Sequence, residues 1–354
     1  TTGGGSATPQ IPSSNAELVS WLGDSTPRVI LLDRIFDFTG TMATAQGCKP
    51  WTCSPHPQVA LSGPGWSNIL CLSSRPNAAK IEITYDKAGP APIKVGSHKT
   101  LLGKGSAGGI KGKGLRIARS QNIIIQTPRT DQLNPRIVWG GDAITIDGGS
   151  NIWVDHNRIQ NIGRQMLVTG YGAAKNTTFS NNMLYGVGYF ATCNGRHYWV
   201  ALFTGASDEI TFALNYSCGE CSGRGPHVGG TSGYTQKVHV YNNYYVSVQG
   251  HALDPEEGSN ILAEGNYMDS VTTPILPVAG SVFYPLTSQD SASCNSVLHR
   301  ACMANMAVNS GKIDVGSTAH LSAFARPAVQ DAQILAASAV PAYVQANARL
   351  GVVN

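Results

Sequence analysis

Three aspartates, Asp142, Asp147 and Asp155, lie within one short segment of the chain. Two carboxylates placed close together perform glycoside hydrolysis, one as acid and the other as base or nucleophile. Alternation along a strand would put Asp142 and Asp147 on opposite faces, which weakens this pairing. The chain has no G-x-S-x-G, H-E-x-x-H or P-loop motif. Serine-esterase, zinc-protease and NTPase chemistry therefore lack their characteristic residues.

A glycine-rich segment, residues 103–108, matches the G-x-G-x-x-G pattern of dinucleotide-binding loops. That fingerprint needs a helix directly afterwards, because the pyrophosphate binds at a helix N-terminus. Residues 109–114 instead add three more glycines, which disfavours a helix and predicts a tight turn. We therefore expect no dinucleotide cofactor at this segment.

The composition separates this chain from several protein classes. Charged residues make up only 13%, and the net charge of +4 is not concentrated in a Lys/Arg cluster. Nucleic acids and anionic membranes are therefore not expected partners. No run approaches the ~18 apolar residues that a membrane-spanning helix needs. The chain begins at Thr1 rather than Met, and its eight cysteines lack paired zinc-site spacing. Together these features indicate a processed, secreted protein with disulfides.

A degenerate repeat organises the middle of the chain. Short β-prone segments each end in an asparagine, and these asparagines recur every 23 to 33 residues. They are Asn157, Asn182, Asn215, Asn243 and Asn266. Short strands at this period, without helices between them, predict a parallel β-solenoid. Asparagine tolerates the left-handed backbone of a sharp bend, and stacked amides can form a hydrogen-bonded ladder.

Two glycosylation sequons begin at Asn176 and Asn215. A ladder position would turn the side chain of Asn215 inward, so we expect its sequon to stay unmodified. Asn176 is then the better candidate for a glycan.

Both ends of the chain depart from the repeat. Ser14 and Glu17 have the spacing of a capping box, which predicts a short helix that shields one end of the solenoid. The alanine-rich segment 321–350 has helical spacing and is expected to pack along the outside. Since no linker divides the chain, we expect a single domain over residues 1–354, with a repeat core at about 80–275.

Several motifs, in order over nearly the whole chain, resemble those of the fungal pectin lyases. They are TTGGGSATP at 1–9, IKGKGL at 110–115, VWGGDAI at 138–144, WVDH at 153–156, IGRQ at 162–165, ATCNGRHYW at 191–199, SGRGP at 222–226 and GHA at 250–252. The resemblance implies an all-β, right-handed parallel β-helix, which agrees with the repeat. It also implies cleavage of pectin by β-elimination: a base removes the C5 proton of a galacturonyl methyl ester, and the C4–O4 bond breaks.

The resemblance implies three catalytic residues. Arg224 matches the catalytic arginine of the family, Asp142 its buried acid, and Arg164 a second arginine in the cleft. Arg164 could stabilise the charge that develops on the ester carbonyl. A guanidinium normally stays protonated to about pH 12, so Arg224 as a base requires a lowered pKa, which burial and a second cation would favour. A surface ion pair remains the alternative for each arginine.

The same resemblance bears on metal and substrate binding. Pectate lyases typically bind Ca²⁺ through several carboxylates, and Arg164 and Val168 occupy the matching positions here. This favours a methyl-esterified substrate, with no metal and no cofactor. Aromatic side chains at or near the cleft positions of the family, together with His197, are expected to hold the sugar chain. They are Trp51, Trp66, Trp139, Tyr198 and Trp199.

The cysteines follow the family pattern with one addition. The pattern implies disulfides Cys48–Cys71, Cys53–Cys193 and Cys294–Cys302. Cys218 and Cys221 are extra, and form either a tight local disulfide, which secretion favours, or two free thiols.

Two departures from the family lie just after Arg224: His227 stands where the family has lysine, and Gly229 where it has glutamine. They bear on substrate range and pH optimum. Two alternatives stay open, a calcium-dependent pectate lyase and a non-catalytic solenoid that binds polysaccharide. A monomer is the expected state of a capped solenoid.

Overall fold

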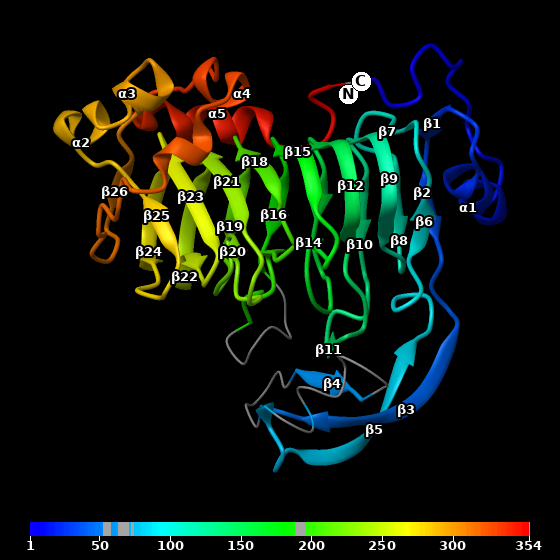
Figure 1. Ribbon diagram of the computed structural model, residues 1–354. Coiled ribbons are helices and arrows are strands. Elements are labelled where there is room, and N and C mark those ends of the chain that lie inside the picture. Colours follow the sequence, from blue (N-terminus) through cyan, green and yellow to red (C-terminus); the bar gives the residue numbers. More distant parts are fainter. Residues whose placement is uncertain (52–57, 63–70, 72–73, 188–194, 354) are drawn as a thin grey trace.

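The computed structural model describes residues 1–51, 58–62, 71, 74–187 and 195–353. The chain winds into stacked coils whose strands pair in parallel to form three faces (Figure 1). Face 1 contains β6 (Ile93–Val95), the first half of β9 (Leu115–Gln126) and of β12 (Ile144–Asp155), β14 (Leu167–Thr169), β17 (Ala201–Phe203), β20 (His227–Val228) and the end of β22 (Tyr244–Pro255). The predicted right-handed parallel β-helix is confirmed.

The other two faces complete each coil. Face 2 contains β1 (Arg28–Leu32), β7 (Lys99–Gly103), the second halves of β9 and β12, β15 (Ala174–Ser180), β18 (Glu209–Ala213), β21 (Gln236–Tyr241), β23 (Ser259–Glu264) and β25 (Ser281–Phe283). Face 3 contains β2 (Ile35–Asp37), β8 (Gly109–Lys111), β10 (Arg129–Asp131), β13 (Arg158–Ile159), β16 (Met183–Tyr185), β19 (Tyr216–Gly219), the start of β22, β24 (Tyr267–Ile275) and β26 (Met306–Val308). Coil strands thus occur both before and after residues 80–275, the interval in which the sequence predicted the repeat core.

Apolar side chains fill the interior in stacks that follow the strand register. Ile152 pairs with Ile123 on one neighbouring coil and with Thr177 on the other. Phe179 pairs in register with Phe212, and its ring also stacks across the interior on that of Phe203, from β17, at a centroid distance of 5.4 Å. Because each coil buries its apolar side chains against its neighbours, the stack rather than any single coil is the stable unit. Residues 103–108 connect β7 to β8 without a helix, which confirms the predicted turn.

The asparagine ladder forms as predicted. Nδ2 of Asn157 donates to Oδ1 of Asn182 at 2.8 Å, and the same contact repeats from coil to coil through Asn215, Asn243 and Asn266. Asn305 extends the ladder, although 39 residues separate it from Asn266. Pro128, which aligns with the asparagines in sequence, lies in register with Asn157. The ladder therefore fixes the bend between faces 2 and 3.

The left-handed bend falls one residue before each ladder asparagine, not on it. His156, Asn181 and Leu214 have φ values of 54°, 51° and 59°, whereas the ladder asparagines lie outside this region. The prediction that asparagine stands there for its backbone tolerance is therefore wrong. The amide contacts are the reason, since they satisfy buried polar groups on the adjacent coil.

Short helices close one end and line the outside. Helix α1 (Asn15–Gly23) begins after Ser14, whose Oγ accepts from Glu17 N at 3.2 Å. The Glu17 carboxylate accepts from Ser13 instead of Ser14, so only half of the predicted capping box forms. The later helices are α2 (Ser288–Ala292), α3 (Asn295–Leu298), η2 (Leu321–Phe324), α4 (Pro327–Gln330), η3 (Ala337–Ala339) and α5 (Val340–Asn347). Within the described residues, no helix is long and apolar enough to cross a membrane.

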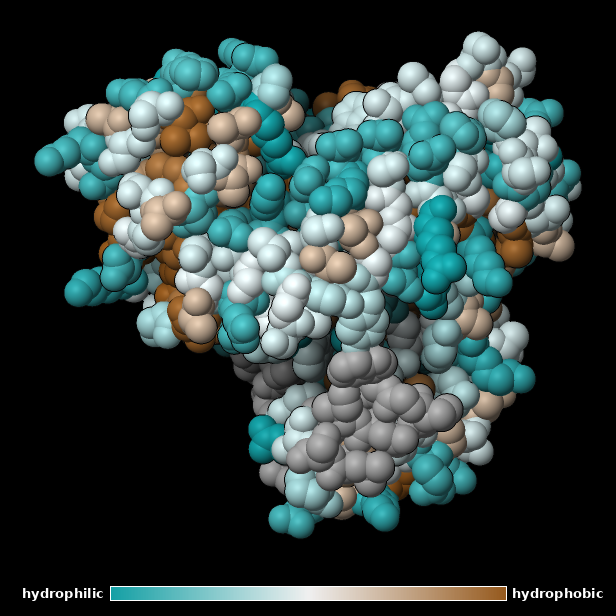
Figure 2. Space-filling model, viewed as in Figure 1, coloured by the Kyte–Doolittle hydropathy of each residue, from teal (hydrophilic) through white to brown (hydrophobic). Residues whose placement is uncertain are grey.

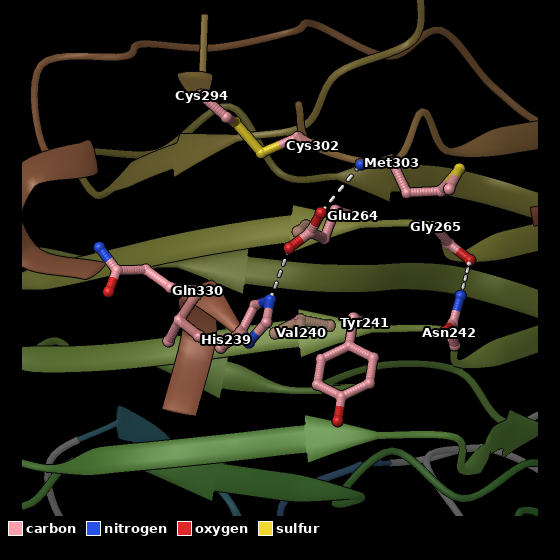
Figure 3. A network of polar contacts seen from close by, with 12 residues as sticks. His239, Val240, Tyr241, Asn242, Glu264, Gly265, Cys294, Cys302, Met303 and Gln330 are labelled. Carbon is pink, nitrogen blue, oxygen red and sulfur yellow. Dashed lines mark hydrogen bonds and ion pairs between the residues drawn. A yellow bond between two sulfur atoms is a disulfide. The ribbon is translucent and has the colours of Figure 1, made fainter. Parts of the chain in front are cut away.

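Glu264, at the end of β23, joins the C-terminal segment to the coils (Figure 3). His239 Nε2 lies 2.8 Å from one carboxylate oxygen, and Arg300 donates to both at 2.8 and 2.7 Å. The Met303 N–H donates at 2.9 Å, and Arg300 also donates to the Val329 carbonyl. The side chains of His239 and Glu264 are 0% exposed. This network therefore fastens the C-terminal segment through a buried charge.

A lobe projects from the coils and carries a four-stranded sheet of its own (Figure 1). Its strands are β3 (Met42–Lys49), β4 (Val59–Leu61), β5 (Ala79–Asp86) and β11 (Ile137–Val138). The disulfide Cys48–Cys71 lies in this lobe. Figure 2 shows hydrophilic and intermediate residues interspersed on the face of the coils above it, with hydrophobic residues gathered toward the left. Since β11 leads directly into Trp139, the lobe positions residues beside face 1.

Candidate active site

A row of side chains crosses the outer surface of face 1. In order along the coils it consists of Arg116, Thr145, Val168, Leu202, His227 and Asp254. Neighbouring strands lie ~4.8 Å apart, so the row forms a continuous floor for an extended ligand. At one end a pocket of about 230 Å³ is lined by Arg116, Thr145, Trp139, Asp142 and Arg164, among others.

The three predicted catalytic residues occupy equivalent places in the fold. Asp142, Arg164 and Arg224 each lie two or three residues before a strand of face 1, namely β12, β14 and β20. Nη1 of Arg164 lies 3.0 Å from Oδ2 of Asp142, and Oδ1 of Asp142 accepts from the Gln165 N–H at 2.8 Å. The Arg164 guanidinium carbon also lies 4.0 Å from the Trp139 ring centroid. A cation is thus held firmly at the groove by one carboxylate and one indole.

Arg224 is held among aromatic rings. Its guanidinium carbon lies 4.8 Å from the Trp199 ring centroid and 5.3 Å from that of Tyr198. Burial lowers the pKa of Arg224 below its ordinary value, and the Arg164 charge adds to this, while Tyr198 and Asp254 act in the opposite direction. Its φ of 57° is left-handed, a backbone strain that is common at functional sites.

Gln165 connects the two arginine positions. Its side chain is fully buried, and in the amide orientation that suits both neighbours its oxygen accepts from Nη1 of Arg224 at 3.2 Å. Its nitrogen then donates to the Trp199 carbonyl at 3.3 Å. Its backbone N–H binds Asp142, so one residue contacts both the carboxylate and Arg224. The predicted catalytic residues are therefore brought together.

His197 lies beneath the groove rather than in it. The residue is 5% exposed, and Nε2 lies 3.0 Å from the Trp199 carbonyl. Burial lowers the pKa of His197 to about 4, against contacts with the backbone of Trp199 and Arg164 that raise it. A neutral imidazole here supports the backbone on which Trp199 and Arg164 are mounted.

The predicted aromatic residues form one wall as far as they are described. Trp51, Trp139 and Trp199 pack against the cluster around the Cys48–Cys71 disulfide, and Tyr198 packs edge-on against Trp199 at 5.1 Å. Trp66 lies outside the described residues, and so does the pairing of Cys53 with Cys193. Cys294–Cys302 and Cys218–Cys221 are both disulfides.

The motifs of the sequence did not single out a pair of tyrosines on the other side of the face 1 strands, in the turns that lead to face 2. Tyr171 is 45% exposed and packs edge-on against Tyr234 at 6.5 Å, both in turns that follow strands of face 1. The Arg164 charge is near enough to oppose the rise that burial and Tyr234 cause in the pKa of the Tyr171 phenol. No local motif marks these two tyrosines, so only the three-dimensional structure shows that they are neighbours.

The surroundings of Asp142 do not fit a divalent cation. Calcium needs about six to eight oxygen ligands, but the neighbours of this carboxylate include a guanidinium. Val168, in the row on β14, is 6% exposed and offers only methyl groups. Within the described ranges, no group of three or more His, Cys, Asp and Glu side chains is placed to hold a metal.

A parallel β-helix with a carboxylate and two arginines beside one face fits a polysaccharide lyase, and the comparisons with known proteins show this class. The chain belongs to the pectate lyase family, whose model matches residues 60–348. It is 45% identical to pectin lyase B of Emericella nidulans over 328 residues, covering 91% of this chain and 84% of that protein. It is 43% identical to a probable pectin lyase A of Aspergillus clavatus over 347 residues, covering 96% and 89%.

Solved structures support the fold. A pectate lyase from Bacillus sp. N165, in complex with trigalacturonate, superposes with a TM-score of 0.64 at 18% identity. The match covers 100% of this chain and 97% of that one. At this identity the likeness concerns the β-helix alone.

Proposed function

We propose that this chain is a pectin lyase that cleaves methyl-esterified polygalacturonan by β-elimination without calcium. Its fungal relatives are named pectin lyases at 43–45% identity over most of the chain. The observation that carries the proposal is the Arg164–Asp142 ion pair of 3.0 Å beside the buried Arg224. This arrangement supplies positive charge to an uncharged ester without a metal.

The chemistry follows from what each side chain can do. The C5 proton becomes acidic only when the adjacent ester carbonyl can take negative charge, and a fixed cation stabilises that charge. Arg164 supplies it, with Asp142 and Trp139 holding the guanidinium in place. Arg224, whose pKa is lowered mainly by burial, accepts the proton. The electron pair then forms the C4=C5 bond as the C4–O4 bond breaks.

The row on face 1 favours a neutral substrate. Thr145, Val168 and Leu202 form its centre, and an ionised carboxylate placed against them would lose water without gaining a partner. A methyl ester carries no such penalty. Trp139 and Trp199 supply the apolar wall that a methyl-esterified sugar chain can contact.

Several further properties belong to this proposal. We expect a secreted, monomeric enzyme whose residues 1–354 act as one domain, without a cofactor, nucleic acid or membrane partner. Asn176 is exposed and is the expected glycan site, whereas Asn215 is 0% exposed in the ladder. Glycan mapping by mass spectrometry after expression in a fungal host tests both positions.

Formation of the unsaturated product, followed by its ultraviolet absorbance, tests the activity. Activity is measured on highly esterified pectin and on de-esterified polygalacturonate, each in the presence of EDTA and in the presence of added calcium. The proposal expects activity on esterified pectin that EDTA leaves unchanged. A preference for polygalacturonate, with activity lost in EDTA, would indicate a calcium-dependent pectate lyase. Binding of the polysaccharide without unsaturated product would indicate a non-catalytic solenoid.

A further inference from the structure

A histidine and an aspartate form a second polar pair in the row on face 1. His227 and Asp254 are register partners on β20 and β22, and His227 Nδ1 is hydrogen-bonded to Asp254 Oδ2. The two side chains are 12% and 6% exposed. Among the residues that the structure describes, Nε2 of His227 has no hydrogen-bond partner. The imidazole is therefore fixed through one nitrogen, with the other available.

The surroundings of Asp254 keep it ionised. Burial acts to raise the pKa of Asp254, but the hydrogen bond from His227 and the charges of His227, His251 and Arg224 outweigh this and hold it below its ordinary value. His251 Nε2 lies 3.6 Å from the same carboxylate oxygen. The carboxylate on Nδ1 fixes the orientation of the His227 imidazole.

Elimination needs a proton donor as well as a base. When the C4–O4 bond breaks, the oxygen leaves with the electron pair and must gain a proton to become the hydroxyl of the new reducing end. Arg224 is occupied with the C5 proton in this proposal, and the Arg164 guanidinium is already held by Asp142 and Trp139. His227 lies three residues beyond Arg224, on the same face.

We propose that His227, held by Asp254, donates the proton to the leaving oxygen. Nε2–H of the imidazolium protonates the oxygen, and a neutral imidazole with its Nδ1 proton remains. Solvent then returns a proton to His227 and removes the one that Arg224 accepted, so that no proton is gained or lost overall. The inference rests on the proposed function, and in particular on Arg224 as the base.

The charged groups around His227 set the pH response. From β22 they are Asp254 and His251, and from the segment before β20 Arg224. Glu256 and Glu257 follow β22, and the Glu256 side chain and His227 Nε2 both approach Gly230. On the other side β17 contributes Leu202, which is uncharged. The carboxylate in contact with His227 is that of Asp254, and the cationic or ionisable groups near this pair are His251 and Arg224.

The variant His227→Gln tests the donor role on two substrates. One is methyl-esterified pectin, and the other an oligogalacturonide methyl ester that carries a 4-nitrophenoxy group on C4 of its non-reducing end. Nitrophenolate leaves without a proton, so it needs no donor. We expect kcat on pectin to fall about 10²- to 10³-fold, with kcat on the nitrophenyl substrate within a few-fold of the parent. His299→Gln, at an exposed position, should leave both unchanged.

The conservative variant His227→Lys adds a pH readout. Lysine holds its proton to higher pH than histidine, so activity on pectin should return in part and its alkaline limit should move upward. The proposal is overturned if His227→Gln retains kcat on pectin, or loses it equally on both substrates while its melting temperature matches the parent. Arg224 variants distinguish the proposed proton donor from the proposed base, because loss of the base lowers kcat on both substrates.

Discussion

Nη1 of Arg164 lies 3.0 Å from Oδ2 of Asp142, and the two side chains are only 15% and 21% exposed. The pair places a fixed positive charge beside the row on face 1 of the candidate site. It also leaves Asp142 with its charge already balanced. The guanidinium next to Asp142 is therefore the feature on which the proposal of a metal-free reaction depends.

Arg164→Gln removes the stabilising charge and keeps a polar side chain. We expect kcat on highly esterified pectin to fall about 10²- to 10³-fold, as for loss of one stabilising group at a developing negative charge. KM should change little, since the ester carbonyl is neutral before reaction. Steady-state kinetics separate the two parameters. Arg349→Gln, at an exposed site, is the matched control, and a rise in KM alone would contradict the assigned role.

Asn215→Ala opens the middle of the ladder. The Asn215 amide donates to Phe179 O and Asn243 Oδ1 and accepts from Asn182, so buried groups on both neighbouring coils lose partners. We expect the variant to be less stable by roughly 3 kcal/mol, since each unsatisfied buried group costs about 1–3 kcal/mol. Chemical denaturation measures the difference. Asn295→Ala, exposed in α3, should unfold like the parent, and an equal midpoint for Asn215→Ala would refute the ladder's contribution.

Glu264→Gln weakens the attachment of the C-terminal segment. Burial acts to raise the pKa of Glu264, but Arg300 and His239 outweigh it and lower the pKa from 4.5 to about 2. A depressed folded-state pKa stabilises the fold above the unfolded value. This contribution should therefore be complete above about pH 4.5 and disappear as the pH falls toward 2.

Denaturation of the parent and of Glu264→Gln at several pH values checks this window. At pH 7 we expect a loss of about 3–5 kcal/mol, because the Arg300 charge is left without its buried partner. This gap, the difference in the free energy of unfolding between the parent and the variant, should narrow at acid pH. Glu82→Gln, an exposed substitution in the lobe, serves as control, and a gap that is constant down to acid pH would argue against a charged Glu264.

The sequence predicted the parts of the fold that repeat. An asparagine recurs at the same position of each coil because every stacked coil must satisfy the same buried polar groups of its neighbour. This recurrence can be read from the sequence. The Asn305 rung was missed because the helices α2 and α3 interrupt the period. The left-handed residue was placed one position too late, because the residues that bend, such as His156, Asn181 and Leu214, share no residue type that would mark them in the sequence.

The candidate site was predictable only in part. Arg164, Arg224 and Asp142 lie in motifs with a family resemblance, and they meet because each precedes a strand of face 1. The Gln165 link, the Tyr171–Tyr234 contact and the burial of His197 depend on packing between coils. Contacts between coils join residues more than twenty positions apart, and no spacing along the chain encodes which side chains face one another.

Single-turnover kinetics of Arg224→Lys and Arg224→Ala, with EDTA present throughout, test the central claim most directly. The proposed base is Arg224, so both variants should form the unsaturated product at least 10²-fold more slowly, with pectin binding retained. The parent should lose nothing in EDTA. Full product formation by either variant, or a parent that stops in EDTA and restarts with calcium, would contradict a metal-free elimination by this arginine.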